Sequence, residues 1–165
     1  MALRRVDPTR PAGPFRRAFS RLGATRSARW FSRVVLWKLD PVLLRVSGGR
    51  VSSTMVVRSA LLETTGARTG QPRRNAVIYV PDGDDVVIAA SLAGAPTNPG
   101  WYHNLVAHPD VVLGGTPMRA AVVDDETERE RLWALADNVF PTFADYRDEA
   151  AAAGRTIPLV RLSPR

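Results

Sequence analysis

Cysteine is absent from this chain of 165 residues, and histidine occurs only at positions 103 and 108. The absence of cysteine excludes disulfide bonds, thiolate catalysis and cysteine-ligated zinc. His103 and His108 are five residues apart, whereas neighbours on one helical face are three or four apart, so we expect no metal site. The sequence also lacks a Ser-His-Asp set, a carboxylate pair, a Walker loop and a dinucleotide fingerprint. No acid, base or nucleophile stands out.

Long apolar runs are also missing. No segment reaches the roughly 18–20 uninterrupted apolar residues that span a bilayer, and the best candidate, residues 30–46, is interrupted by charged residues and a proline. The pair Arg4 and Arg5 is not followed by the apolar stretch of a secretory signal. We expect a cytoplasmic protein. An organelle transit peptide has the same Arg-rich and acid-poor composition, and it stays open as an alternative.

Positive charge is concentrated in the first third of the chain. Residues 1–60 hold thirteen cations and two carboxylates, a net charge of +11, whereas residues 61–165 hold ten arginines and fourteen carboxylates, a net charge of −4. The basic part could attract nucleic acid, an anionic membrane or an acidic small molecule. We expect no nucleic-acid role, because neither a recognition helix nor a set of sheet aromatics is recognisable.

The sequence divides into a basic arm, residues 1–45, and one folded domain, residues 46–165, which is long enough to bury a single core. The arm opens with a Pro- and Arg-rich lead that we expect to be disordered. A helical stripe of Trp30, Val34 and Trp37 then has cations beside it. Such a stripe is typical of a helix that lies on an anionic membrane, or of a helix packed on its own domain, and both interpretations stay open. The first would place the protein peripherally at the inner face of the cell membrane.

The folded domain alternates between short β-branched runs and helical segments. Asp82-Gly83 and Gly114-Gly115 are hairpin signals, Asn98 is a candidate helix cap with Pro99 as the first helical residue, and Asp124 or Asp125 opens another helix. We expect an α+β domain built around a small antiparallel barrel. The expected strands are residues 61–65, 75–80, 86–90, 111–113, 118–123 and 157–162, and the expected helices are residues 99–107, 126–138 and 143–153.

A glycine-rich turn separates the first two expected strands. Gly66 and Gly70 permit a positive φ, and backbone amides in such a turn, together with Arg68 and Arg73, can bind an anion. Arg73 and Arg74 are adjacent on a strand and should point to opposite faces, so we expect at most one of them beside a ligand. A solvated turn without a ligand is the alternative.

A second candidate site follows the third strand. Ser91 ends that strand, and residues 92–97 are mostly small, which allows a flat ring to lie near the main chain. A helix then starts near Trp101, and its free N–H groups should point toward this loop. The alternative, which we favour for Trp101, is a core anchor. Further along, Phe140, Phe143 and Tyr146 recur every three residues, a spacing that suits a pocket wall or a plain core.

These motifs occur in an order that resembles one known family, the deazaflavin-dependent nitroreductases of actinobacteria, which are F420-dependent quinone and nitro-drug reductases. The resemblance covers residues 61–160. It rests on TTGARTGQPR at 64–73, Asn75, AAS at 89–91, NPGWYHNL at 98–105, Pro109, Pro141 with Asp145-Tyr146, and RTIP at 155–158. Several separated matches in register are more specific than any one of them.

The resemblance implies a split β-barrel of the flavin-reductase type that binds coenzyme F420. Cations of the turn would hold its phosphate and acidic oligoglutamate tail, while loop 92–100 and the helix start would hold the deazaflavin ring through main-chain contacts. The cofactor-binding residues implied are Arg68, Thr69, Gly70, Arg73, Asn75, Ser91, Asn98, Trp101 and Asn104.

The resemblance also implies a hydride transfer from reduced F420 to a lipophilic quinone-like, nitro or conjugated-carbonyl acceptor. In such chemistry the reactive carbon belongs to the cofactor, which accounts for the missing catalytic set. Ser91 would orient the acceptor, and Tyr146 or water would supply a proton. The substrate-binding residues implied are Ile78, Tyr79, Phe140, Phe143 and Tyr146.

The sequence departs from the family pattern at several positions. Ala67 and Leu92 stand where the family has basic residues, while Phe140, Phe143 and Ile78 replace tyrosines. The first two changes reduce the positive charge available to bind an anion, and the other three remove hydroxyls that could act on a nitro group. Two alternatives to an F420-dependent reductase therefore stay open: an enzyme that uses FMN or FAD on the same barrel, and a non-catalytic F420- or lipid-binding protein.

Overall fold

The computed structural model describes residues 59–165. The predictions for the basic arm, and the predicted start of the folded domain at residue 46, lie outside the described residues.

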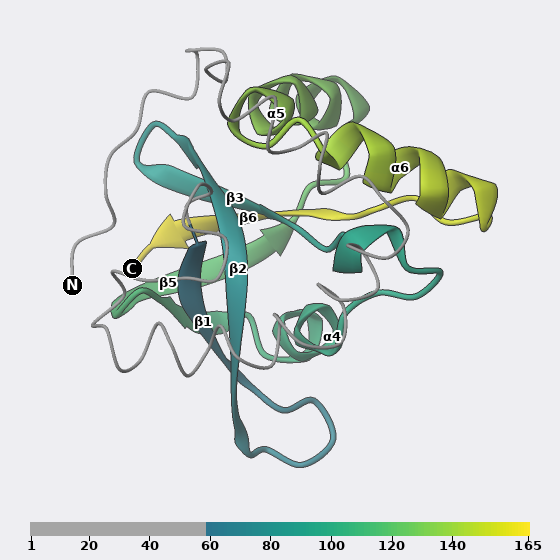
Figure 1. The fold of residues 1–165 in the computed structure, drawn as a ribbon. Coiled ribbons are helices and arrows are strands. Elements are labelled where there is room, and N and C mark those ends of the chain that lie inside the picture. Colours follow the sequence, from purple (N-terminus) through teal and green to yellow (C-terminus); the bar gives the residue numbers. More distant parts are fainter. Residues whose placement is uncertain (1–58) are drawn as a thin grey trace.

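Six antiparallel strands form a closed barrel in the order β1-β2-β3-β6-β5-β4 (Figure 1). The strands are β1 (Ser59–Thr65), β2 (Pro72–Asp82), β3 (Asp85–Ala89), β4 (Asp110–Leu113), β5 (Thr116–Val122) and β6 (Leu159–Pro164). The helices are the short 3₁₀ helix η2 (Leu92–Gly94), α4 (Gly100–Ala107), α5 (Glu126–Val139) and α6 (Phe143–Ala152). The predicted α+β class, with a small antiparallel barrel and flanking helices, is confirmed.

The helices cover different sides of the barrel. In Figure 1, α5 and α6 lie together on one side, α4 lies on another, and η2 lies between α4 and α6. The hairpin turn between β1 and β2 extends away from the barrel beyond α4.

Two apolar clusters explain why several strands are buried on both faces. Inside the barrel, Leu62 and Ile88 pack with Trp101 and Leu105 of α4. On the outside, residues such as Val87 of β3 pack against α5 and α6. In β3 the consecutive residues Val86, Val87 and Ile88 are therefore all buried, whereas β1 alternates between buried and half-buried positions. Burial on both faces fixes where the helices sit against the barrel.

The local signals for turns and caps were mostly sufficient. Gly83, Gly114 and Gly115 have positive φ values of 64°, 56° and 85° in the two predicted hairpins. Asp125 caps α5, since its side chain accepts a hydrogen bond from the amide of Glu128 at 2.7 Å. Asp125 thus resolves the choice between two candidate caps.

The predicted cap of α4 was wrong. Pro99, and not Asn98, is the N-cap residue of α4, and it makes no side-chain cap hydrogen bond. The Asn98 side chain is occupied elsewhere, because its Oδ1 accepts from Nε of Arg155 at 2.9 Å. The last strand also begins two residues later than expected, at Leu159, since Pro158 has no N–H to contribute to a strand ladder.

Candidate active site

A cavity of about 690 Å³ opens where β2, the end of β3, η2, α4 and α6 meet. This volume lies within the range of about 300–1,000 Å³ that is usual for small-molecule sites. Its lining combines arginines and amides with small and apolar side chains. The lining residues are Arg73, Arg74, Asn75, Ala76, Val77, Ile78, Ala89, Ser91, Leu92, Ala93, Asn98, Pro99, Gly100, Trp101, Asn104, Phe143 and Tyr146.

Most of the predicted site residues are brought together here. Of the predicted cofactor-binding set, the cavity is lined by Arg73, Asn75, Ser91, Asn98, Trp101 and Asn104, and of the predicted substrate set by Ile78, Phe143 and Tyr146. Arg68, Thr69 and Gly70 lie on the exposed turn beside the cavity and are not among its lining residues.

Two predicted substrate residues lie behind the cavity wall. Tyr79 is buried in the barrel core, with 5% of its surface exposed, because adjacent strand residues point to opposite faces and Ile78 takes the cavity side. Phe140 packs edge-on against Phe143, with ring centroids 5.1 Å apart, and lies 6.0 Å from the ring of Tyr146. Phe140 therefore supports two lining aromatics without lining the cavity itself.

The turn between β1 and β2 is closed by its own backbone. The amide of Gly66 donates to the carbonyl of Gln71 at 2.9 Å, and the amide of Gly70 donates to the carbonyl of Gly66 at 2.8 Å. Gly70 has a φ of 65°. A Cβ added at Gly66 would lie 2.8 Å from Oγ1 of Thr69 and 3.1 Å from the carbonyl oxygen of Gln71, so a side chain at this position would force Thr69 and the turn backbone to shift.

Asn104 connects this turn to α4. Its Oδ1 accepts from the amide of Ala67 at 3.0 Å, and its Nδ2 donates to Oγ1 of Thr64 at 3.0 Å. The Thr64 hydroxyl is buried. The predicted cofactor residue Asn104 thus has a structural role that the sequence did not indicate, because its partners lie about forty positions earlier in the chain.

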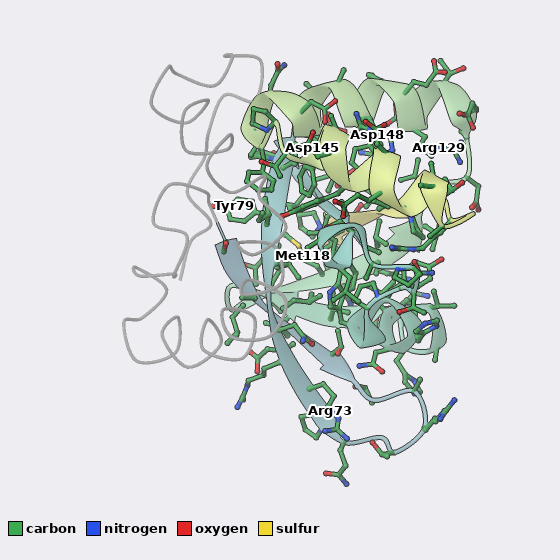
Figure 2. The ribbon with its side chains drawn as sticks, turned by 45° about the vertical axis from the view of Figure 1, so that its right-hand side comes forward. Arg73, Tyr79, Met118, Arg129, Asp145 and Asp148 are labelled. Carbon is green, nitrogen blue, oxygen red and sulfur yellow. The ribbon has the colours of Figure 1, made fainter. Side chains whose placement is uncertain are left out.

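Arg73 and Arg74 both line the cavity, and the expectation that at most one of them lies beside a ligand stays a prediction. At the exposed start of β2, long side chains can reach the same opening from either face. Their electrostatic states differ. Arg74 forms an ion pair with Glu63 of β1 at 2.7 Å, whereas Arg73 forms no ion pair with any residue in the range 59–165. Figure 2 shows Arg73 at the turn end of β2.

The loop after β3 forms the opposite wall with an unusual backbone. Leu92 and Ala93 have φ values of 45° and 51° and are followed by Gly94 at 75°. Three consecutive residues thus occupy the left-handed region that only glycine visits readily. Ser91, Leu92 and Ala93 face the cavity. Arg155, which sequence reasoning did not select as a site residue, donates hydrogen bonds to this loop from behind, and its burial lowers the pKa of its guanidinium.

The start of α4 completes the wall beside this loop. Pro99, Gly100 and Trp101 line the cavity, and the first N–H groups of a helix have no partner within it, so they are available to a ligand. Trp101 is 7% exposed and belongs to the barrel core, which means that it is both a core anchor and a wall residue. The two interpretations of Trp101 are compatible.

Two further observations concern the described residues alone. Residues 59–165 contain no group of three or more His, Asp or Glu side chains arranged to hold a metal ion. Within the same range no helix has the length and apolar character needed to cross a membrane.

The fold and the cavity first indicate a class of protein. In the described part of the chain, a small antiparallel barrel carries a cavity whose lining includes no carboxylate and no histidine. Such a cavity suits a barrel whose chemistry is supplied by a bound cofactor. The sequence profile of the F420H2-dependent quinone reductases matches residues 37–164. The chain belongs to this family, which confirms the predicted family, the reductase activity and coenzyme F420 as the cofactor.

Individual relatives agree with this assignment. An F420H2-dependent quinone reductase of Mycobacterium tuberculosis is 36% identical over 149 residues, which cover 84% of this chain and 98% of the relative. A second protein of the same organism, named as a putative F420H2-dependent quinone reductase, is 33% identical over 113 residues, covering 66% of this chain and 92% of that one. Among solved structures, an F420-H2-dependent reductase is 31% identical with a TM-score of 0.56, covering 64% of this chain and 93% of the other.

Proposed function

We propose that this protein uses reduced F420 to reduce a lipophilic acceptor of the quinone type, with nitro and conjugated-carbonyl compounds as chemically related candidates. One observation supports this proposal above the others. A single cavity is lined both by polar groups predicted for the cofactor, such as Arg73, Ser91 and Asn98, and by the apolar side chains of Ile78 and Phe143. A cofactor and an apolar acceptor can therefore share the cavity.

The residues present fit a deazaflavin. Ala76, Ala89, Ala93 and Gly100 give the cavity small side chains, so a flat ring can approach the main chain closely. The start of α4 offers amides to the polar edge of such a ring. Arg73 supplies a cation at the turn end of the cavity, where a phosphate or carboxylate tail would leave it.

When bound, reduced F420 supplies the hydride, and the protein residues prepare the acceptor for it. The hydroxyl of Ser91, which precedes η2 and lines the cavity, would donate a hydrogen bond to an acceptor oxygen. Ile78 and Phe143 exclude water from the apolar part of the acceptor. Tyr146, which also lines the cavity, or a water molecule beside it, donates the proton that completes reduction of the oxygen.

A direct test is a fluorescence titration of F420 with the protein at micromolar concentration, repeated with FMN, followed by turnover of menadione with reduced F420. We expect saturable F420 binding, weaker FMN binding and oxidation of F420H2 that depends on menadione. Absence of F420 binding would contradict the whole proposal. F420 binding without turnover of any quinone would instead support a non-catalytic binder.

We further propose that residues 1–45 bring the domain to an anionic membrane surface, where lipophilic acceptors reside. Support comes from the net positive charge of this part of the chain and from its stripe of tryptophans. The full chain and a version that begins at Ser47 should be sedimented with liposomes that contain anionic lipid and with neutral liposomes. We expect the full chain alone to sediment, and only with anionic liposomes. Equal behaviour of the two proteins would contradict this role.

A further inference from the structure

Arg155 makes four hydrogen bonds to residues beside the cavity and does not line the cavity itself. It lies in the segment between α6 and β6, and its guanidinium donates to four oxygen atoms. Nε donates to Oδ1 of Asn98 at 2.9 Å, Nη1 donates to the carbonyls of Ser91, at 3.3 Å, and of Ala95, and Nη2 donates to the carbonyl of Ala90. All four acceptors belong to residues 90–98.

These partners distinguish Arg155 from the other half-buried arginines. Arg147 and Arg161 are bound to carboxylates, as expected for a partly buried cation. Arg155 makes no ion pair within residues 59–165 and is surrounded instead by three backbone carbonyls and one amide oxygen. The planar fork of an arginine can bridge several acceptors at once, and a lysine cannot reproduce that geometry. The contacts therefore serve the shape of the loop.

The loop needs an external restraint. Leu92 and Ala93 both have positive φ values, which side chains with a Cβ disfavour. Within the loop, the amide of Gly94 donates to the carbonyl of Ser91 at 3.0 Å, and the amide of Ala95 donates to the carbonyl of Leu92 at 3.1 Å. A backbone held in this region persists only where its surroundings determine it.

The opposite side of the loop lies against α6. A Cβ added at Gly94 would stand 2.7 Å from Oε2 of Glu149 and 3.2 Å from the carbonyl oxygen of Tyr146. The loop is thus enclosed between Arg155 and the helix that carries Phe143 and Tyr146. The loop that lines the cavity at Ser91, Leu92 and Ala93 is therefore in contact with the helix that lines it at Phe143 and Tyr146.

We infer that Arg155 is a positioning residue: it holds residues 90–98 in the conformation that places Ser91 and the main chain of the cavity wall, without touching either reactant. This inference rests on the proposed function for its effect on the reaction, whereas its effect on the loop is independent of any ligand. Loss of the Arg155 guanidinium and its hydrogen bonds should make the loop more mobile and weaken F420 binding. It should also slow hydride transfer, because transfer depends on the alignment of the reacting atoms.

The test compares Arg155→Lys and Arg155→Gln with wild type. Arg161→Lys is the matched control, since Arg161 is also a half-buried arginine but binds Asp82, Asp85 and Glu128 away from the cavity. The first measurement is hydrogen exchange, followed by mass spectrometry, of the peptide that contains residues 90–98 in protein without cofactor. We expect faster exchange of this peptide in both Arg155 variants and unchanged exchange in the control. Unchanged exchange in the Arg155 variants overturns the inference.

The second measurement is functional. We expect Arg155→Lys to raise the Kd for F420 and to lower kcat with menadione, each by about tenfold, with the KM for menadione within about twofold of wild type. Because Arg155 acts through the loop, the combination of Arg155→Lys with Ser91→Ala should lower kcat by less than the product of the two single effects. Full multiplicativity would contradict action through Ser91. Gly94→Ala displaces the loop from the α6 side and should reproduce the raised Kd if the Arg155 variants do not fold.

The two proposals can fail separately. If wild type does not bind F420 but loop exchange rises in the Arg155 variants, the proposed function is overturned and the restraint of the loop is supported. If wild type binds and turns over, but the Arg155 variants match it in exchange, Kd and kcat, the proposed function is supported and the positioning role is overturned.

Discussion

Arg73 allows the sharpest test of how the cavity binds an anionic cofactor. Its neighbour Arg74 is already paired with Glu63 at 2.7 Å, so the charge of Arg74 is largely compensated, whereas Arg73 has no ion pair within residues 59–165. If the turn holds the phosphate or the acidic tail of F420, Arg73 contributes an uncompensated positive charge to the cavity lining formed by residues 59–165. Arg68, further out on the exposed turn, is the second source.

The size of the effect follows from the exposure of Arg73. A hydrogen bond to a charged group contributes about 1.5–3 kcal/mol, and Arg73 is exposed, which favours the lower end of that range. Replacement by glutamine should therefore raise the Kd for F420 about tenfold, because 1.36 kcal/mol corresponds to a factor of ten. Charge reversal in Arg73→Glu adds a repulsion of similar size, and the Kd should then rise about a hundredfold.

The control removes a neutral pair. The double variant Glu63→Gln with Arg74→Gln leaves the net charge of the turn unchanged, and its Kd should stay within about twofold of wild type, since no net attraction is lost. Kd is measured by F420 fluorescence at low salt and again near 1 M salt, where the Debye length falls to about 3 Å and the effect of Arg73 should shrink. An unchanged Kd in Arg73→Glu, or an equal loss in the neutral-pair variant, would refute the reasoning.

Three further predictions concern stability and the turn. The carboxylate of Asp82 accepts hydrogen bonds from both terminal nitrogens of Arg131, at 3.0 and 2.7 Å, and from Nη1 of Arg161 at 2.9 Å. Asp82→Asn should therefore lower the free energy of unfolding by about 2 kcal/mol, measured by urea denaturation at pH 7. The hydrogen bond from Arg131 is the main cause that lowers the pKa of Asp82 below 3.8. Because the pKa of Asp82 is lower in the folded state, its stabilising effect is complete above the unfolded-state pKa and is lost as pH falls through the folded-state pKa. The difference in unfolding free energy between wild type and Asp82→Asn should therefore be constant above about pH 5 and vanish in stronger acid. A difference that persists in strong acid would contradict a stabilising role for the ionised Asp82 carboxylate. The side chain of Leu132 has 0% exposure and packs between α5 and the barrel. Leu132→Ala should lower the free energy of unfolding by about 2–5 kcal/mol in the same assay. A loss below about 1 kcal/mol would show that the helix is not tightly packed. Asn104→Ala removes the two hydrogen bonds that join α4 to the turn and to the end of β1. It should raise the Kd for F420 several-fold while Tm falls by only a few degrees; an unchanged Kd would show that the turn keeps its position unaided.

Local patterns in the sequence were enough for most of the fold. The hairpin glycines and the helix after residue 125, with Asp124 or Asp125 as its cap, were predicted from neighbouring residues. The alternation in β1 and the burial of β3 on both faces were not predicted. The cap of α4 was missed because the side chain of Asn98 binds Arg155, 57 positions away. No local pattern carries that information.

In the candidate site, too, local sequence patterns predicted some features, whereas contacts between distant residues determined others. Motifs at residues 73–75, 91 and 98–104 were brought to one cavity, as their resemblance to a known family implied. The opposite orientations of Ile78 and Tyr79 could have been deduced from strand alternation alone. The roles of Asn104 and Arg155 could not, since they depend on backbone groups that are distant in sequence and become neighbours only in the folded barrel.

The strand order has a consequence for the timing of folding. β6 lies between β3 and β5, and β1 meets β4 through only two paired positions, Leu62 with Leu113 and Glu63 with Val112. A chain synthesised from its N-terminus therefore has the β1-β2-β3 and β4-β5 segments available well before the strand that joins them. Arg155 precedes β6 by a few residues, so a growing chain gains the closing strand and the proposed restraint on the cavity loop almost together. We therefore expect a chain that ends before Arg155 to lack F420 binding, and cofactor capture to await synthesis of this last segment.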